Sequence, residues 1–267
     1  MNNVVLWALI ATLGTWSVTA LGSAIVLFIK KPNKNFLNLM LGFSAGVMIA
    51  ASFWSLLQPA IEEAENNLTV PPYFVVTVGF VLGAVFIWLS DRAVSYALNK
   101  TSKSTDTNNK ILNRVIMLIL SITIHNIPEG LAVGVAFGLL KNNNLTPDAI
   151  MGAVSIAIGI GLQNFPEGAA VSMPLRREGY SRRKSFLYGQ ASAVVEPISG
   201  VLGALLVSSV KTILPYALSF AAGAMIIVAV HELIPECQQD QNIQPYTATM
   251  GIISGFTIMM LLDVMLG

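Results

Sequence analysis

Residues 121–138 read SITIHNIPEGLAVGVAFG, and residues 159–172 read GIGLQNFPEGAAVS. Both stretches are apolar enough to be buried, yet each has a proline, a glutamate and a hydrogen-bonding side chain at its centre. Ionisable side chains are rare inside such segments and mark functional sites where they occur. Repetition of the pattern within one chain predicts a polar site built twice from the same local structure.

The composition places these stretches in a membrane. Hydrophobic residues make up 54% of the sequence and charged residues 11%, well below the roughly 25% charged share of soluble domains. About 20 apolar residues in a helix cross a bilayer core, and the runs are too long and continuous for barrel strands. We therefore expect an all-α integral membrane protein, a single transmembrane domain over residues 1–267. Eight transmembrane helices are predicted, at 4–29, 36–60, 73–98, 112–139, 148–173, 185–209, 215–235 and 246–266.

Basic residues are unevenly shared among the connections, which predicts the orientation. They gather after span 1, between spans 3 and 4, and between spans 5 and 6: Lys30, Lys31, Lys34, Arg92, Lys100, Lys103, Lys110, Arg114, Arg176, Arg177, Arg182, Arg183 and Lys184. The alternate connections contain only Lys141 and Lys211, together with the acidic run 62–65. Loops rich in lysine and arginine stay in the cytoplasm, so we expect both termini outside the cytoplasm, in the cell (inner) membrane.

Other features narrow the class of protein. The first span lacks a preceding basic segment and is too long for a signal peptide, so we expect it to stay in the mature protein. The single cysteine, Cys237, excludes an internal disulfide framework. A net charge of +1 argues against a nucleic-acid partner, and there is no GxxxxGK[ST] phosphate loop. The polar segment 99–110, NKTSKSTDTNNK, is predicted to be a flexible cytoplasmic loop.

The sequence also contains an internal repeat. FSAGVM at 43–48 matches FAAGAM at 220–225, and at the same offset Thr19 falls opposite Glu196. With the two PEG motifs as a second pair, this predicts a 3+2+3 arrangement, in which spans 1–3 and 6–8 are inverted copies around the paired central spans 4 and 5. Inverted repeats with interrupted helices indicate a transporter with a midplane site, although similar small-residue helices also arise by chance or for close packing.

Within each motif, the polar side chains share one helix face. His125 and Glu129 are four residues apart, and Gln163 and Glu167 have the same spacing, so each pair projects from one side of its helix. The proline between them lacks an N–H and clashes with the carbonyl four residues earlier, which kinks the helix and frees that carbonyl. Each motif therefore presents a nitrogen or amide ligand and a carboxylate at one depth.

Electrostatic cost favours a cation at this depth. Glu129, Glu167 and Glu196 fall near the middle of their predicted spans, and three uncompensated carboxylates there would cost roughly 10 kcal/mol. Because no lysine or arginine lies at that depth, a cation, protons or both must balance the charge. Imidazole with carboxylate suits Zn²⁺ and neighbouring transition metals, whereas Ca²⁺ and Mg²⁺ use oxygen ligands almost alone.

The same residues also have purely structural explanations. His125 alone would fit an interhelical hydrogen bond, Glu196 a protonated packing residue, and Met48 a gap filler. The amides that would fit interhelical hydrogen bonds are Asn126, Gln163 and Asn164. The duplicated motif, with a glutamate one turn after the histidine, favours a cation site over these alternatives.

Together with VVEPISG in span 6 and HELIPE in span 7, the PEG motifs resemble the ZIP (zinc- and iron-regulated transporter-like) family, most closely its prokaryotic GufA-like branch, across all eight spans. The resemblance implies uptake of Zn²⁺, Fe²⁺, Mn²⁺ or Cd²⁺ into the cytoplasm without a prosthetic group, through a site for two metals. By motif, the first metal would be held by Met48, His125, Glu129, Gln163 and Glu167. The second would use Asn126, Asn164 and Glu196 and share Glu129 and Glu167.

The resemblance also implies a cytoplasmic exit site and is compatible with a homodimer. The exit residues would be His231, Glu232, Glu236 and Asp91. The chain departs from the family pattern in three places: the loop 99–110 has no histidine, which puts metal sensing there in doubt, while Gln163 and Asn164 replace the histidine and aspartate of some relatives. These replacements imply a first site that is harder and less selective for zinc, and a second site that holds its ion more weakly.

Three functions fit the residues. The first is a carrier that moves divalent metal by alternating access, and the second is a selective divalent-cation channel through the same site. The third is an intramembrane metalloenzyme, suggested by HELIPE, but a zincin needs histidines at i and i+4 and position 235 is proline. The sequence therefore favours transport and leaves carrier and channel open, with metal ions and the lipid bilayer as partners.

Overall fold

A computed structural model describes residues 3–28, 34–101, 107–140, 145–209, 211–238 and 246–266. For residues 97–101, 107–115, 117, 118, 121, 177, 208, 209 and 211, it describes the backbone alone. Among the basic residues that predicted the orientation, Lys30, Lys31, Lys103 and Lys141 lie outside the described residues, as do the side chains of Lys100, Lys110, Arg114, Arg177 and Lys211.

Eight helical segments within the described residues are long and apolar enough to cross a membrane, as predicted, and no strand occurs among these residues. The first four are α1 (Asn3–Phe28), the continuous run of α2 (Lys34–Ala51), η1 (Ser52–Leu57) and α3 (Gln58–Asn67), then α4 (Pro72–Thr101) and α5 (Thr107–Leu139). The last four are α6 (Pro147–Arg177), α7 (Arg182–Ala191) with α8 (Val195–Ser209), the run η2 (Lys211–Ile213), α9 (Leu214–Val228), η3 (Ala229–Leu233) and α10 (Ile234–Gln238), and α11 (Tyr246–Leu266).

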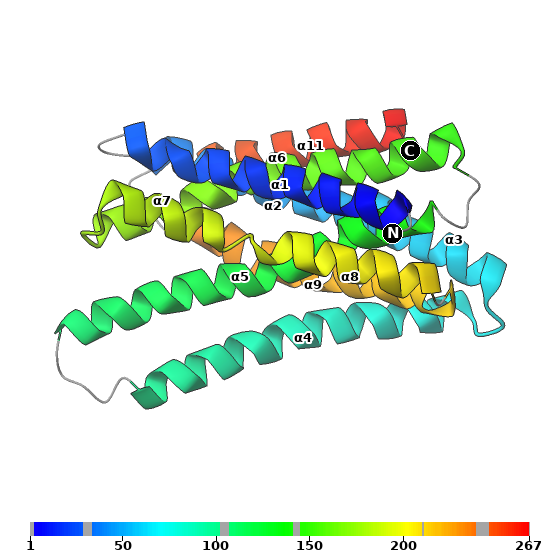
Figure 1. Cartoon of the computed structure of the whole chain (residues 1–267), viewed down its shortest axis with the longest axis horizontal. Helices are drawn as coiled ribbons and strands as arrows, with labels where there is room; N and C mark the ends of the chain where they lie inside the picture. The colour runs from blue at the N-terminus through cyan, green and yellow to red at the C-terminus, as the bar shows by residue number, and fades with distance from the viewer. Residues whose placement is uncertain are drawn as a thin grey trace.

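Both termini lie at the end of the bundle where α3 lies, whereas α4 ends and α5 begins at the opposite end (Figure 1). We call the first of these the outer end and the second the inner end. The helices extend into the predicted loop 99–110 from both sides, because α4 continues to Thr101 and α5 begins at Thr107. Residues 102–106, in the middle of that loop, lie outside the described residues.

Local sequence explains where the central helices begin and how they pass the membrane. Thr146 caps α6 by accepting a hydrogen bond from the backbone N–H of Ala149, with Pro147 at the first helical position, where a missing N–H costs nothing. Pro128 lies inside α5 and Pro166 inside α6, so both helices continue through their prolines. Each proline leaves the carbonyl four residues earlier without its helical partner, beside the polar residues of the motif.

Tight helix pairs follow the sequence repeat. The most extensive pairings are α1 with α6, α5 with α8, α2 with α11 and α4 with α9. Gly83 of α4 abuts the backbone carbonyl of Phe220 in α9, and Gly255 of α11 abuts that of Phe43 in α2, so a Cβ at either glycine would overlap the carbonyl. Phe43 and Phe220 are the first residues of the matching segments FSAGVM and FAAGAM, and the two contacts therefore involve equivalent positions of the repeat.

The two π-helical segments are also equivalent. η1 begins at Ser52 in the second span and η3 begins at Ala229 in the seventh, and the alignment that pairs Phe43 with Phe220 also pairs these two residues. A π-helical turn contains an extra residue, and such turns often occur at functional sites. The hydrophobic pattern gave no sign of either segment, because one extra residue hardly changes which side chains face the core.

Candidate metal centre

Buried polar side chains meet where the middle parts of α5 and α6 lie near the first turn of α8. All eight predicted midplane residues are at most 6% exposed: Met48, His125, Asn126, Glu129, Gln163, Asn164, Glu167 and Glu196. Polar groups removed from water in this way need hydrogen-bond or ionic partners. Which of them have partners, and which do not, decides what the centre can bind.

Glu196 of α8 is firmly held. Thr15 of α1 donates a hydrogen bond of 2.5 Å to its Oε2, and the amide nitrogen of Asn164 lies 2.9 Å from both carboxylate oxygens. The same amide also donates to the backbone carbonyl of Thr15 at 3.2 Å. Asn164 therefore uses its N–H groups to fix Glu196, which leaves the amide oxygen of Asn164 without a hydrogen-bond partner among the described residues.

Glu167 of α6 accepts one side-chain hydrogen bond among the described residues. The hydroxyl of Ser44 in α2 donates to its Oε1 at 3.0 Å. Met48 is fully buried one turn after Ser44 and on the same face of α2. The repeat segment FSAGVM thus brings a hydroxyl and a thioether to the side of α2 that faces the second PEG motif.

Glu129 of α5 is the least satisfied group of the centre. It is completely buried, and neither of its carboxylate oxygens has a hydrogen-bond partner among the described residues. Both polar atoms of Gln163 are in the same situation. Glu167 and Glu196 lie close enough to Glu129 to interact with it electrostatically. Three carboxylates therefore lie close together, and a positive group between them would balance their charge.

Asn126 resembles Asn164, because its amide nitrogen donates a hydrogen bond and its amide oxygen has no partner among the described residues. The nitrogen donates to the backbone carbonyl of Ser192 at 3.1 Å, and the oxygen is buried. Buried carboxylate and amide oxygens without donors, next to the amide of Gln163, form a ligand set suited to a divalent cation.

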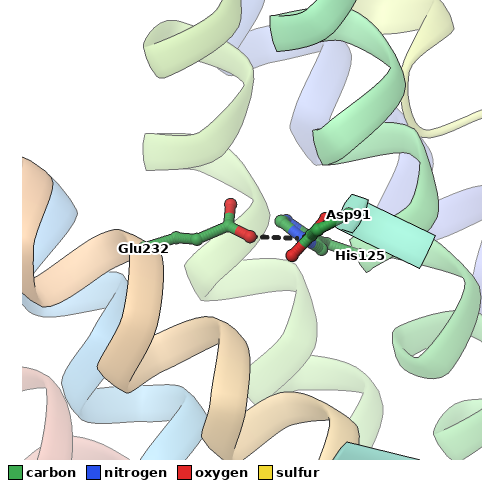
Figure 2. A group of neighbouring side chains, drawn as sticks. All are labelled: Asp91, His125 and Glu232. Carbon is green, nitrogen blue, oxygen red and sulfur yellow. Dashed lines mark ion pairs between the residues drawn. The ribbon is translucent and has the colours of Figure 1, made fainter. Parts of the chain in front are cut away.

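A second cluster, drawn in Figure 2, surrounds His125. His125 lies one turn before Glu129 on α5 and therefore nearer the inner end. His125 Nε2 is 2.8 Å from a carboxylate oxygen of Glu232 in η3 and 3.9 Å from one of Asp91 in α4. One ligand atom from each of these three residues lies within 4.8 Å of the others, a spacing that fits one metal ion. The sequence assigned His125 to the midplane set and the two acids to the exit set, whereas the structure brings all three together.

The other two residues of the predicted exit site stand apart. His231 and Glu236 are exposed, and neither belongs to a group of three or more metal-ligating side chains in the part of the chain that the structure describes. His231 precedes Glu232 within η3, and adjacent helical residues point in different directions. The motif HELIPE therefore supplies one residue to the cluster, Glu232.

Sequence reasoning missed the hydroxyl groups that orient the glutamates. Thr15 of α1, which donates to Glu196, was not among the predicted site residues. Ser44 was also missed, although its place four residues before Met48 was a usable signal, because residues at that spacing share a helix face.

Comparison with known proteins agrees with this geometry. Residues 4–113 and 99–263 match the family described as ZIP Zinc transporter. The chain belongs to this family. The zinc transporter ZIP11 of Xenopus tropicalis is 40% identical over an alignment of 334 positions, gaps included, which covers 98% of each chain. The bacterial relatives include zinc transporter ZIPB of Bordetella bronchiseptica, 34% identical over 98% of this chain and 82% of its own, and zinc transporter GufA of Myxococcus xanthus, 32% identical over 97% and 98%.

Membership of the ZIP family confirms the resemblance drawn from the PEG motifs. It makes the chain a multi-pass membrane transporter of divalent metal rather than an enzyme. The failed zincin signature in HELIPE agrees with that conclusion. For a transporter of this family, the metal is the cargo.

Proposed function

We propose that this ZIP-family chain carries Zn²⁺ into the cytoplasm, with Fe²⁺, Mn²⁺ and Cd²⁺ as further candidate substrates. The observation that carries the proposal is Glu129, a fully buried carboxylate without a hydrogen-bond donor among the described residues. Its charge requires a positive partner, and a travelling dication supplies one. The relatives named as zinc transporters support zinc as the first choice.

The midplane centre would hold two metal ions, as the family resemblance implies. The first would take Met48, His125, Glu129, Gln163 and Glu167, and the second Asn126, Asn164 and Glu196 with Glu129 and Glu167 as bridges. The unpaired amide oxygens of Asn126 and Asn164 support this assignment, since a neutral oxygen without a donor is free to bind a cation. With Gln163 in place of a histidine, the first ion meets mostly oxygen ligands, which weakens selection for zinc.

His125 would pass the metal from the midplane towards the inner end. It shares a helix face with Glu129, one turn away, and its imidazole contacts Glu232. A metal bound to His125 could exchange the midplane carboxylate of Glu129 for the carboxylates of Asp91 and Glu232, and it would keep the imidazole as a ligand throughout. Release to the cytoplasm would follow from this inner cluster, and His231 and Glu236 would take part only after η3 moves.

Access would alternate by movement of one group of helices against another. One group would be the pairs α1–α6 and α5–α8, which contact each other between α1 and α8. The other group would be the pairs α2–α11 and α4–α9. Equivalent glycine contacts in α2–α11 and α4–α9 support two inverted copies in a 3+2+3 arrangement. We propose that the chain lies in the inner membrane with both termini outside the cytoplasm, as the basic connections predict. A homodimer is compatible with this arrangement.

The test is uptake of radiolabelled Zn²⁺ into vesicles that contain the purified protein. The double variant Glu129→Ala, His125→Ala should lose uptake, whereas Glu65→Ala, which removes an exposed acid of α3, should keep it. Saturation at low metal concentration would favour a carrier over a channel. Normal uptake by the double variant would overturn the proposal.

A further inference from the structure

Asp263 of α11 joins three helical segments at the outer end of the bundle. Its Oδ1 accepts a hydrogen bond of 2.6 Å from Ser55 in η1 and one of 3.1 Å from Ser155 in α6. Both serines are buried, at 5% and 0% exposed. Nothing in the motifs, the exit site or the family resemblance drew attention to these residues.

The three-way contact forms part of the wall of a cavity. The cavity has a volume of about 430 Å³, and Ser55 and Asp263 line it together with the exposed side chains of Gln58, Glu62 and Asp148. On α6, Ser155 lies eight residues, or about 12 Å, before Gln163 of the midplane centre. The hydrogen bond from Ser155 therefore ties the outer part of a ligand-bearing helix to α11 at the edge of an outer cavity.

Asp263 and Asp91 occupy equivalent positions of the repeat. Gly79, Gly83 and Asp91 in α4 have the same spacing as Gly251, Gly255 and Asp263 in α11. As described above, Gly83 and Gly255 also pack against equivalent phenylalanine carbonyls.

The partners of the two aspartates are equivalent too. Ser55 lies in η1 and Glu232 in η3, each three residues after the start of its π-helical segment. At the inner end, Asp91 and Glu232 contact His125 of α5. At the outer end, Asp263 contacts both Ser55 and Ser155 of α6. Each end of the bundle thus joins a π-helical turn and an aspartate to one of the two PEG helices.

We propose that Asp263 is a positioning residue of transport, which holds α6 closed at the outer end as Asp91 and Glu232 hold α5 at the inner end. The inference rests on the alternating access proposed above. When the contact with Ser155 breaks, the outer part of α6 moves away from α11 and the cavity deepens towards Gln163. The contact then re-forms as the metal moves inwards.

The difference between the two ends supports a holding role for Asp263 over a metal-binding role. The inner cluster combines an imidazole with two carboxylates, which is a ligand set for a transition metal. The outer contact has a single carboxylate, whose Oδ1 is occupied by two hydroxyl donors. Its buried Oδ2 has no partner among the described residues, so the contact offers a metal one oxygen where the inner cluster offers three ligand groups. Such hydrogen bonds to a charged acceptor are strong and directional, and they can be broken and re-formed without binding the cargo.

The closing experiment measures outer access in the absence of metal. In a Cys237→Ser background, Ile156→Cys on α6 places a thiol at a cavity-lining position that is 7% exposed. Gly152→Cys is the matched reporter, because a Cβ there meets no atom within 4 Å. A membrane-impermeant maleimide added from the outer side should label the thiol at position 156 about tenfold faster when Asp263→Ala is added, as expected for loss of a charge-assisted hydrogen bond. Labelling of the thiol at position 152 should not change.

Three further variants define the source of the effect. Ser155→Ala should reproduce the faster labelling, and Asp263→Asn should give a smaller increase, because an amide oxygen still accepts a hydrogen bond. Ser254→Ala, which removes a hydroxyl that donates to the Gly251 carbonyl of the same helix, should have no effect. Ser155→Ala and Asp263→Asn keep the test valid if Asp263→Ala fails to fold.

Uptake kinetics separate a positioning role from a ligand role. With the outer end biased open, the maximal uptake rate of Asp263→Ala should fall about tenfold, in parallel with the labelling change, while the KM for Zn²⁺ does not rise. Unchanged labelling in both Asp263→Ala and Ser155→Ala, or a raised KM at an unchanged maximal rate, would overturn the inference. Because labelling needs neither metal nor transport, a failure of the midplane assignments would leave this result interpretable.

Discussion

The two PEG motifs differ little in sequence and strongly in surroundings. Both lie on long helices with a proline in the same place, and each presents its polar residues at one depth. In α6, Glu167 receives a hydrogen bond from Ser44, and Asn164 is committed to Glu196. In α5, Glu129 has no donor among the described residues, and His125 contacts Glu232 of another helix.

We propose that the two motifs divide the work of the centre. The α6 motif, fixed by neutral donors, would give the centre its shape, whereas the α5 motif has a carboxylate without a donor among the described residues and a histidine that contacts the inner cluster. Local sequence sets which residues share a face, and the neighbouring helices set what each residue does. The α5 motif should therefore be the more sensitive of the two to substitution.

The largest effect is expected at Glu129. Replacing it with Gln removes a buried anion that the cation alone balances, and loss of one partner of a buried charge pair costs about 2–5 kcal/mol. Zinc uptake at low concentration should fall at least about 30-fold. In detergent, saturating Zn²⁺ should raise the melting temperature of the unmodified protein and leave that of Glu129→Gln nearly unchanged.

The same substitution at Glu167 should have a smaller effect on both measurements, because Ser44 already stabilises that carboxylate. Equal losses from Glu129→Gln and Glu167→Gln would show that the two motifs act alike. The proposed division of work would then be wrong.

The second largest effect is expected at His125. Its replacement with Ala removes the imidazole shared by the two clusters, and loss of a group in a metal centre lowers affinity or activity by about 10- to 100-fold. The maximal rate of uptake should fall by a factor in that range. The chain has one other histidine, His231, which is exposed and serves as the matched control.

His231→Ala should change the maximal rate less than about threefold, the range of a surface substitution. A result in which His231→Ala is as harmful as His125→Ala would favour the exit site that HELIPE suggested over the cluster with Asp91 and Glu232.

The predicted and observed structures agree where hydrophobicity alone decides. The last span was predicted at 246–266, and α11 is Tyr246–Leu266, because an apolar run ends where the bilayer ends. The fourth span was predicted to start at 112, whereas α5 starts at Thr107. Polar residues outside the lipid continue a helix as long as no proline or glycine stops it, and hydropathy does not register them.

In the candidate site, the sequence predicts which residues of one helix lie together, but not which residues of different helices meet. Spacing within one helix placed His125 with Glu129, which follows from helix geometry. The contact of His125 with Glu232 joins residues that are far apart along the chain, and it depends on how η3 turns towards α5. A single sequence contains no direct sign of that orientation. The prediction therefore assigned His125 to the midplane set and Glu232 to the exit set, whereas the structure brings the two side chains into contact.

The smallest effect is expected at Ser44, the donor that distinguishes Glu167 from Glu129. Ser44→Ala should cost about 1 kcal/mol, the net value of one hydrogen bond, and lower zinc uptake about fivefold. Ser17→Ala is the control, because the Ser17 hydroxyl donates to the Leu13 carbonyl of its own helix, on an exposed face. In the Glu167→Gln background, Ser44→Ala should add little, because contacting residues are energetically coupled. If the two effects instead add in full, Ser44 acts somewhere other than on Glu167, and the contrast between the two PEG glutamates must have another cause.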